Sequence, residues 1–219
     1  MKNIVVYHGS ERLIEKPEFG YGNKHNDYGL CFYCAIDEEL GKEWACKESN
    51  FGYLNTFSIS IPDSTKILNL TDKTKYSVLN WIAILLKFRF LSDDFVKRNK
   101  RAFEFLSKYY IDVEQYDLII GYRADDSYFA FPRAFIENKI SLERLEEIYF
   151  LGELGIQYAF KTKPMFDLIK HLNSSEVGQE YHVRYVTRIN NAKLKYEELL
   201  EICNEEKGTF MRDLVNKND

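Results

Sequence analysis

The chain has 219 residues, with 30 Lys+Arg against 34 Asp+Glu and a formal net charge of −4 at pH 7. Hydrophobic residues make up 45% of it and charged residues 29%, a balance that excludes a wholly disordered, collagen-like or low-complexity chain. We expect one main domain with a substantial core, because a chain of this length buries roughly 70% of the surface that it exposes when unfolded. The mild acidity and the lack of a basic block argue against tight nonspecific binding to nucleic acid.

Neither targeting nor membrane insertion is expected. The opening segment, MKNIVVYHGS, carries one Lys and only a short apolar run, so we expect no secretory signal peptide and a cytoplasmic protein. The longest apolar stretch, residues 78–91, is interrupted by Lys87 and Arg89 and falls short of the ~20 residues that cross a bilayer. It predicts a buried helix.

Two kinds of periodicity divide the chain into strands and helices. Alternating apolar and polar residues, as in 55–61, predict a half-buried strand, whereas apolar residues three and four positions apart, as in 75–110, predict amphipathic helices. The expected strands are 3–7, which places His8 at a strand end, 30–35, 55–61, 66–70, 116–122 and 156–160. The expected helices are one through 40–45 capped by Asp37, a helical insertion over 75–110, one through 142–149 capped by Ser141, a short one from Pro164 and one near 192–203.

Strands scattered among helices of uneven length indicate an α+β fold rather than a regular βαβ winding. We expect residues 1–172 to form the main domain and residues 173–219 to form a C-terminal helical extension. Loops are expected at 10–28 and 122–138.

The four cysteines, Cys31, Cys34, Cys46 and Cys203, allow three interpretations: two disulfides, a zinc site, or reduced thiols packed in the core. Together with His25, residues Cys31, Cys34 and Cys46 could ligate zinc, but their spacing lacks the second close ligand pair of most structural zinc sites. We therefore favour reduced, packed thiols and predict no metal site.

Three segments taken in chain order indicate a function. Each residue alone has a structural explanation: a strand-end histidine, core aromatics, or a solvated glutamine. In order, however, Tyr7-His8-Gly9-Ser10, Asp27-Tyr28-Gly29-Leu30-Cys31-Phe32-Tyr33 and Gln157-Tyr158-Ala159-Phe160-Lys161-Thr162 resemble the three strand motifs of the ADP-ribosyltransferase fold.

More narrowly, the chain resembles a little-characterised bacterial family of that fold, encoded in toxin–antitoxin-like gene pairs. The segment 116–126, followed by a helix and then Gln157, is similar to the second half of that family. The resemblance covers about residues 3–172 and implies a split-sheet ADP-ribosyltransferase-like fold.

The resemblance implies NAD as substrate and assigns roles to the motif residues. His8 would donate a hydrogen bond to a ribose hydroxyl, and the Gly9 backbone would grip the nicotinamide carboxamide. Tyr33 would stack on the nicotinamide ring, and Gln157 would bond the 2′-hydroxyl of its ribose. The remaining candidates for contact with NAD are Ser10, Tyr28, Phe32 and Asp125.

The chain departs from the best-known branch of the fold at the third motif. Gln157 stands where that branch has Glu; an amide carries no charge and cannot act as a general base. Asp125 or Asp126 could supply the missing charge, Asp126 being the candidate catalytic acid, although a solvated turn is the alternative.

Two further residues bear on the motifs. Cys31 stands where a glycine is more usual and could narrow the pocket. Glu180, in a segment 179–185 that alternates like a strand, is a rival for the third motif, but Gln157 has the expected helices on both sides.

We therefore expect NAD-dependent mono-ADP-ribosyl transfer, or NAD hydrolysis, by an intracellular toxin restrained by a small antitoxin protein. The alternative is a catalytically silent binding module for a nucleotide or a protein partner. A phosphotransferase acting on RNA ends is a weaker third hypothesis, because the chain lacks a basic patch.

Overall fold

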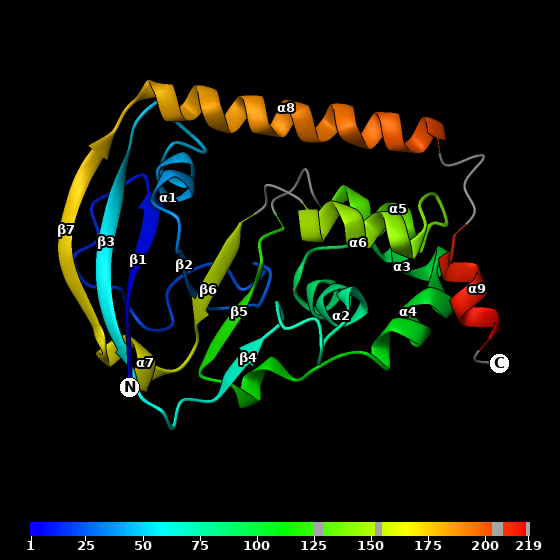
Figure 1. The fold of residues 1–219 in the computed structure, drawn as a ribbon, viewed down its shortest axis with the longest axis horizontal. Helices are drawn as coiled ribbons and strands as arrows, with labels where there is room; N and C mark the ends of the chain where they lie inside the picture. The colour runs from blue at the N-terminus through cyan, green and yellow to red at the C-terminus, as the bar shows by residue number, and fades with distance from the viewer. Residues whose placement is uncertain (125–128, 152–154, 203–207, 218–219) are drawn as a thin grey trace.

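The computed structural model describes residues 1–124, 129–151, 155–202 and 208–217. Within them, one mixed sheet of seven strands runs in the order β4-β5-β6-β2-β1-β3-β7 and packs with helices, so the fold is α+β (Figure 1). The strands are β1 (Lys2–Ser10), β2 (Phe32–Ala35), β3 (Gly52–Ile61), β4 (Ile67–Asn69), β5 (Leu118–Tyr122), β6 (Ile156–Phe160) and β7 (Ile169–Val177).

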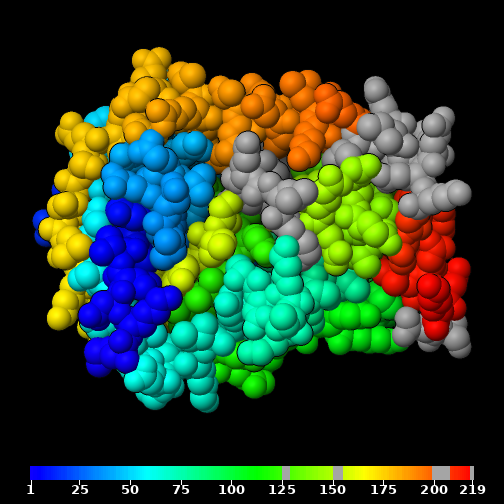
Figure 2. Space-filling view, viewed as in Figure 1, coloured from blue at the N-terminus to red at the C-terminus, as the bar shows by residue number. Residues whose placement is uncertain are grey.

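The helices gather mostly beyond the β4 and β5 side of the sheet. They are α1 (Glu38–Ala45), α2 (Val78–Phe88), α3 (Asp93–Arg98), α4 (Lys100–Ser107), α5 (Ala130–Ile136), α6 (Leu142–Leu151), α7 (Lys163–Asp167), α8 (Gln179–Ile202) and α9 (Met211–Asn216). Figure 1 shows α2 to α6 and α9 on one side of the molecule and β1, β3 and β7 on the other. The long helix α8 lies along one edge between these two parts, as the space-filling view also shows (Figure 2).

A narrow seam divides the sheet. β1 and β2 are joined through a single register pair, Tyr7 with Ala35, whereas β1 pairs with β3 along its whole length from Lys2 to Ser10. β4 and β5 run parallel, and the other neighbouring strands run antiparallel. The seam therefore separates β4-β5-β6-β2 from β1-β3-β7.

Several sequence predictions are confirmed. The helical periodicity of 75–110 corresponds to α2, α3 and α4, and the first of these is buried as expected. Both predicted caps are present: Asp37 accepts a hydrogen bond from the Leu40 amide at 2.9 Å, and Ser141 accepts one from the Arg144 amide at 3.2 Å. These caps satisfy amide groups that the first helical turn leaves without a partner.

Other expectations were wrong. The first strand continues to Ser10, so His8 lies inside it and pairs with Asn55. Residues 122–138, expected to form a loop, contain α5, and residues 179–185, expected to alternate as a strand, begin α8, so Glu180 lies in a helix. The expected end of the main domain at residue 172 falls inside β7, which adds residues up to Val177 to the sheet.

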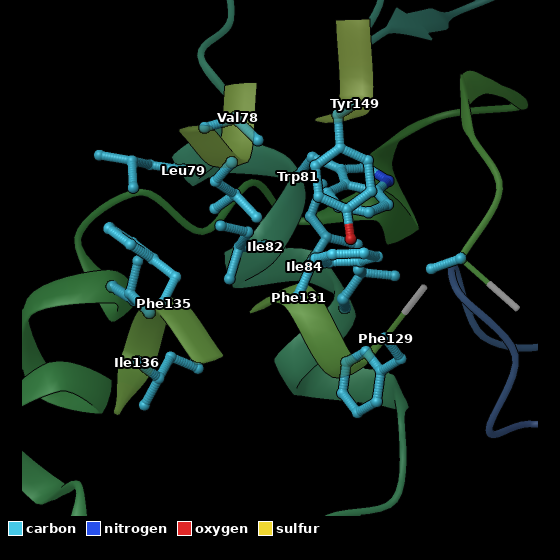
Figure 3. Packing of buried hydrophobic residues seen from close by; sticks show 14 of the residues in the cluster. Val78, Leu79, Trp81, Ile82, Ile84, Phe129, Phe131, Phe135, Ile136 and Tyr149 are labelled. Atoms are coloured by element: carbon cyan, nitrogen blue, oxygen red, sulfur yellow. The ribbon is translucent and has the colours of Figure 1, made fainter. Parts of the chain in front are cut away.

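The largest core cluster packs the helices against β5 and β6. Figure 3 shows Trp81 of α2 and Tyr149 of α6 packed ring against ring, with centroids 4.2 Å apart. Burying a large apolar side chain of this kind stabilises the fold by about 1.5–3 kcal/mol. Within the described part of the chain, no helix is both long and apolar enough to span a membrane.

Candidate functional site

A cleft of about 1000 Å³ opens where β1, β2 and β6 meet the segment that follows β1. It brings together six of the residues predicted to form the site. They are His8, Gly9, Ser10, Phe32, Tyr33 and Gln157.

The sheet register explains this convergence. Gln157 lies opposite Ala35, and Ala35 lies opposite Tyr7, the residue before His8. The first and third motifs are therefore two strand spacings apart, about 10 Å, with the second motif on the strand between them. A ligand of nucleotide size can span that distance.

His8 links the two sides of the seam. Its Nδ1 lies 2.7 Å from the Tyr33 carbonyl oxygen, and its ring lies 4.5 Å from the Phe32 ring. Burial lowers the pKa of His8, which favours the neutral imidazole. Since a carbonyl oxygen only accepts, Nδ1 carries the proton and Nε2 is left as an acceptor. The neutral His8 is thus arranged to accept, not donate, a hydrogen bond at Nε2.

Gly9 is required by packing. A Cβ at this position would lie 2.1 Å from the Gly41 carbonyl oxygen and 2.4 Å from the Ala45 amide nitrogen, both in the backbone of α1. Only glycine lets α1 approach the strand this closely. This contact explains the residue whether or not its backbone also binds a ligand.

Tyr33 and Tyr28 play different parts. The Tyr33 hydroxyl donates to the Gly29 carbonyl at 2.6 Å and accepts from the Tyr28 amide at 3.1 Å, which holds its ring at the cleft wall. Tyr28 is fully buried behind the cleft, where its hydroxyl donates to the Tyr122 carbonyl at 2.8 Å and accepts from Trp81 Nε1 at 3.0 Å. Tyr28 is therefore not among the residues that line the cleft, and its buried hydroxyl has a structural role.

Asn55 anchors the segment that follows β1. Its Nδ2 donates to Ser10 Oγ at 2.9 Å, and its Oδ1 accepts from the Ile14 amide at 2.8 Å and from Ser174 Oγ at 2.8 Å. The side chain is fully buried, so losing it would leave polar groups without partners. Sequence reasoning missed this role, because the alternation of 55–61 marked the position only as the start of a strand.

Asp27 is the acid that sequence reasoning missed. Its Oδ2 accepts from Gln157 Nε2 at 2.8 Å and from the Ala124 amide at 2.8 Å, and it lines the cleft although the residue is only 5% exposed. Arg89 Nη1 lies 3.6 Å from its other oxygen, Oδ1. Burial raises the pKa of Asp27, and the neighbouring guanidinium opposes this shift. Its place immediately before Tyr28 in the second motif was the only available signal. The predicted Asp125 and Asp126 lie outside the described residues.

Two arginines in the cleft rest on aromatic rings. The Arg123 guanidinium lies 4.0 Å from the Trp44 ring centroid, and that of Arg89 lies 5.2 Å from the Phe129 ring centroid. Such stacking fixes the orientation of the planar guanidinium group. The other cationic residues that line the cleft are Arg12, Lys16 and Lys47, and the acidic residues besides Asp27 are Glu11, Glu15 and Glu18.

The cysteines do not form a metal centre in the described part of the chain. No group of three His, Cys, Asp or Glu side chains there could hold a metal ion, so the zinc alternative with His25 finds no support. Cys31, Cys34 and Cys46 are buried free thiols, and Cys203 lies outside the described residues. Burial raises the pKa of Cys31 to about 11, so this cleft residue is not a reactive thiolate at neutral pH.

A family described as "Protein of unknown function (DUF3990)" matches residues 4–171. No curated protein and no solved structure matches the chain significantly.

Proposed function

The chain belongs to the DUF3990 family, and we propose that it is an NAD-dependent mono-ADP-ribosyltransferase, acting as an intracellular toxin that a small antitoxin protein restrains. One observation carries the proposal. His8, Tyr33 and Gln157, whose order in the chain resembles the three ADP-ribosyltransferase motifs, line a single cleft.

The seam in the sheet also supports the finer fold assignment. A split-sheet fold divides its sheet into two parts, and here a single register pair joins β1 to β2. The pair is Tyr7 with Ala35: His8 follows Tyr7 directly in β1, and Tyr33 lies two residues before Ala35 in β2.

The residues of the cleft match the nicotinamide, ribose and pyrophosphate groups of NAD. The nicotinamide ring stacks on Tyr33, a ribose hydroxyl donates to His8 Nε2, and another donates to the side-chain oxygen of Gln157. The aromatic-backed Arg89 and Arg123 are suited to the pyrophosphate, because guanidinium groups bind phosphate oxygens in pairs.

In the reaction, the bond between the nicotinamide nitrogen and the ribose C1 breaks, and its electron pair leaves with nicotinamide. A lone pair of the acceptor then forms the new bond to C1, and the acceptor loses its proton to solvent. Polar groups fixed around the ribose stabilise the cation-like transition state without having to reorganise. Water as the acceptor gives NAD hydrolysis.

The second candidate is a catalytically silent module that binds a nucleotide. The observation that favours it is the uncharged amide of Gln157 at the position where the better-known branch carries an acid. Such a module would bind NAD without releasing nicotinamide.

The test combines calorimetric titration of NAD with measurement of nicotinamide release. We expect wild type to bind and release, and His8→Ala and Tyr33→Ala to reduce release by at least tenfold. His25→Ala is the matched control, because His25 is exposed and does not line the cleft. No binding at millimolar NAD would refute the proposal, and binding without release would favour the silent module.

A further inference from the structure

We propose that Asp27 is a positioning residue that holds Gln157 with its side-chain oxygen facing the ribose of NAD, so that the amide takes over the acceptor role of a carboxylate. This inference rests on the proposed function and assigns a role to an acid outside the expected catalytic set.

The hydrogen bonds of Gln157 determine which way its amide points. Nε2 donates to Asp27 Oδ2 at 2.8 Å and to the Tyr122 carbonyl at 3.2 Å. Both partners accept, and an NH₂ group has two hydrogens, so the nitrogen side of the amide is fully used. The flipped amide would set its oxygen against two acceptors and is excluded.

The oxygen Oε1 is consequently the atom left for a ligand. Among the described residues Oε1 has no hydrogen-bond partner. It is also absent from the set of fully buried side-chain atoms without a partner, so Oε1 is accessible to solvent. Gln157 is 3% exposed and lines the cleft, so the small exposed part of this side chain faces the cleft. Oε1 can accept from a ribose hydroxyl as a carboxylate oxygen would.

Asp27 itself is rigidly held. Its Oδ2 also accepts from the Ala124 amide at 2.8 Å, while Oδ1 has no hydrogen bond and faces Arg89 at 3.6 Å. If Asp27 takes up a proton, the proton goes to Oδ1, because Oδ2 is occupied by two donors. The contact with Gln157 therefore holds in either protonation state.

This geometry also explains why glutamine, and not glutamate, suits position 157. A carboxylate there would face Asp27 Oδ2 and the Tyr122 carbonyl, two acceptors at the distances that Nε2 now spans. Repulsion between acceptors, and between two carboxylates, would displace it. The carboxylate is therefore carried by Asp27, which binds the amide at position 157, and not by position 157 itself.

The experiment measures the Kd for NAD and the kcat for nicotinamide release in full-length variants. Asp27→Ala removes the acceptor, and we expect kcat to fall about 100-fold, the effect of a reacting group misplaced by about 1 Å, with Kd changed far less. Asp27→Asn can place its Oδ1 where Oδ2 now lies, keeping both hydrogen bonds, so it should recover activity to within about fivefold of wild type.

Substitutions at position 157 complete the cycle. Gln157→Glu should lower kcat rather than raise it, although it restores the residue of the better-known branch. Adding Asp27→Asn to Gln157→Glu removes one of the two facing carboxylates and should raise kcat at least tenfold over Gln157→Glu alone. Asp37→Ala is the stability control, because it removes a helix cap worth about 1 kcal/mol away from the cleft.

A spectroscopic measurement tests the contact without turnover. The side-chain amide of Gln157 should give slowly exchanging NMR signals in wild type and Asp27→Asn, and faster exchange with a chemical-shift change in Asp27→Ala. If Asp27→Asn is as impaired as Asp27→Ala, if Gln157→Glu is more active than wild type, or if the Gln157 signals do not change in Asp27→Ala, the positioning role is refuted. Wild type that binds no NAD refutes the proposed function, and the ribose partner of Gln157 with it.

Discussion

Replacing Tyr28 with Phe separates a structural tyrosine from a ligand-binding one. The substitution deletes a hydroxyl that donates to the Tyr122 carbonyl and accepts from Trp81 Nε1. Trp81 Nε1 also lies 3.2 Å from the Tyr122 carbonyl, so donor and acceptor retain each other when the hydroxyl is lost. No buried group is left without a partner, and the cost is that of one hydrogen bond, about 1 kcal/mol.

The assay is urea unfolding followed by tryptophan fluorescence, with calorimetric NAD binding on the same samples. A loss of 1 kcal/mol lowers the urea concentration at the unfolding midpoint by about 0.3–1 M, because the m-value of such unfolding is about 1–3 kcal/mol/M. Tyr28→Ala should cost about 3–5 kcal/mol, because it also empties a fully buried site. Tyr53→Phe is the matched control, since its hydroxyl makes no hydrogen bond among the described residues, and it should stay within about 0.5 kcal/mol of wild type.

The two readouts can contradict the reasoning separately. A loss of 3 kcal/mol or more in Tyr28→Phe would show that Trp81 and Tyr122 do not compensate for the hydroxyl. A tenfold loss of NAD affinity at unchanged stability would place Tyr28 in contact with the ligand, as its position in the second motif had suggested.

Three further substitutions or conditions test other parts of the structure. Gly9→Ala should destabilise the protein by about 3 kcal/mol, because the added Cβ would overlap the backbone of α1. Gly20→Ala is the control: Gly20 has φ +83° and nothing within 4 Å of an added Cβ, so the variant should lose only about 1–2 kcal/mol to backbone strain. Equal losses in urea unfolding would contradict the contact between Gly9 and α1. Burial lowers the pKa of His8, so as the pH falls the unfolded chain takes up the proton before the folded protein does. The free energy of unfolding should therefore decrease from pH 7.5 to pH 5.5. If a His8→Gln variant shows the same decrease, His8 does not contribute to it. With its pKa raised to about 11, Cys31 should resist iodoacetamide at pH 8 in the native protein and react in urea, as peptide mass spectrometry would show; rapid native labelling would contradict its burial.

Local patterns were sufficient for most of the elements near the site. The β-branched run before His8 and the alternation of 55–61 predicted β1 and β3, and Asp37 and Ser141 predicted the first residues of two helices. These signals are local, because a strand face and a helix cap each depend on residues within a few positions of one another.

Other elements were missed because their partners lie far away in the chain. β7 is exposed along most of its length and shows no apolar alternation; it is a strand because β3 offers it a free edge. The alternating segment 179–185 is helical instead, and α8 packs on α1 through Arg188, whose Nε lies 2.7 Å from Glu43. Tertiary contacts outweigh weak local preferences in both cases.

The sequence by itself determined which chemical groups are available: an imidazole, an aromatic pair and an amide in three ordered segments, with an α+β pattern to carry them. Only the tertiary structure decided how those groups act. It brings Asp27 within hydrogen-bond distance of Gln157, 130 residues away in the chain, and it buries Tyr28 in the core. It also stacks Arg89 and Arg123, which line the cleft, on aromatic rings. The physical reason is that the burial of a carboxylate and the direction of an amide depend on neighbours brought together by sheet register and helix packing, and local sequence carries no record of those neighbours.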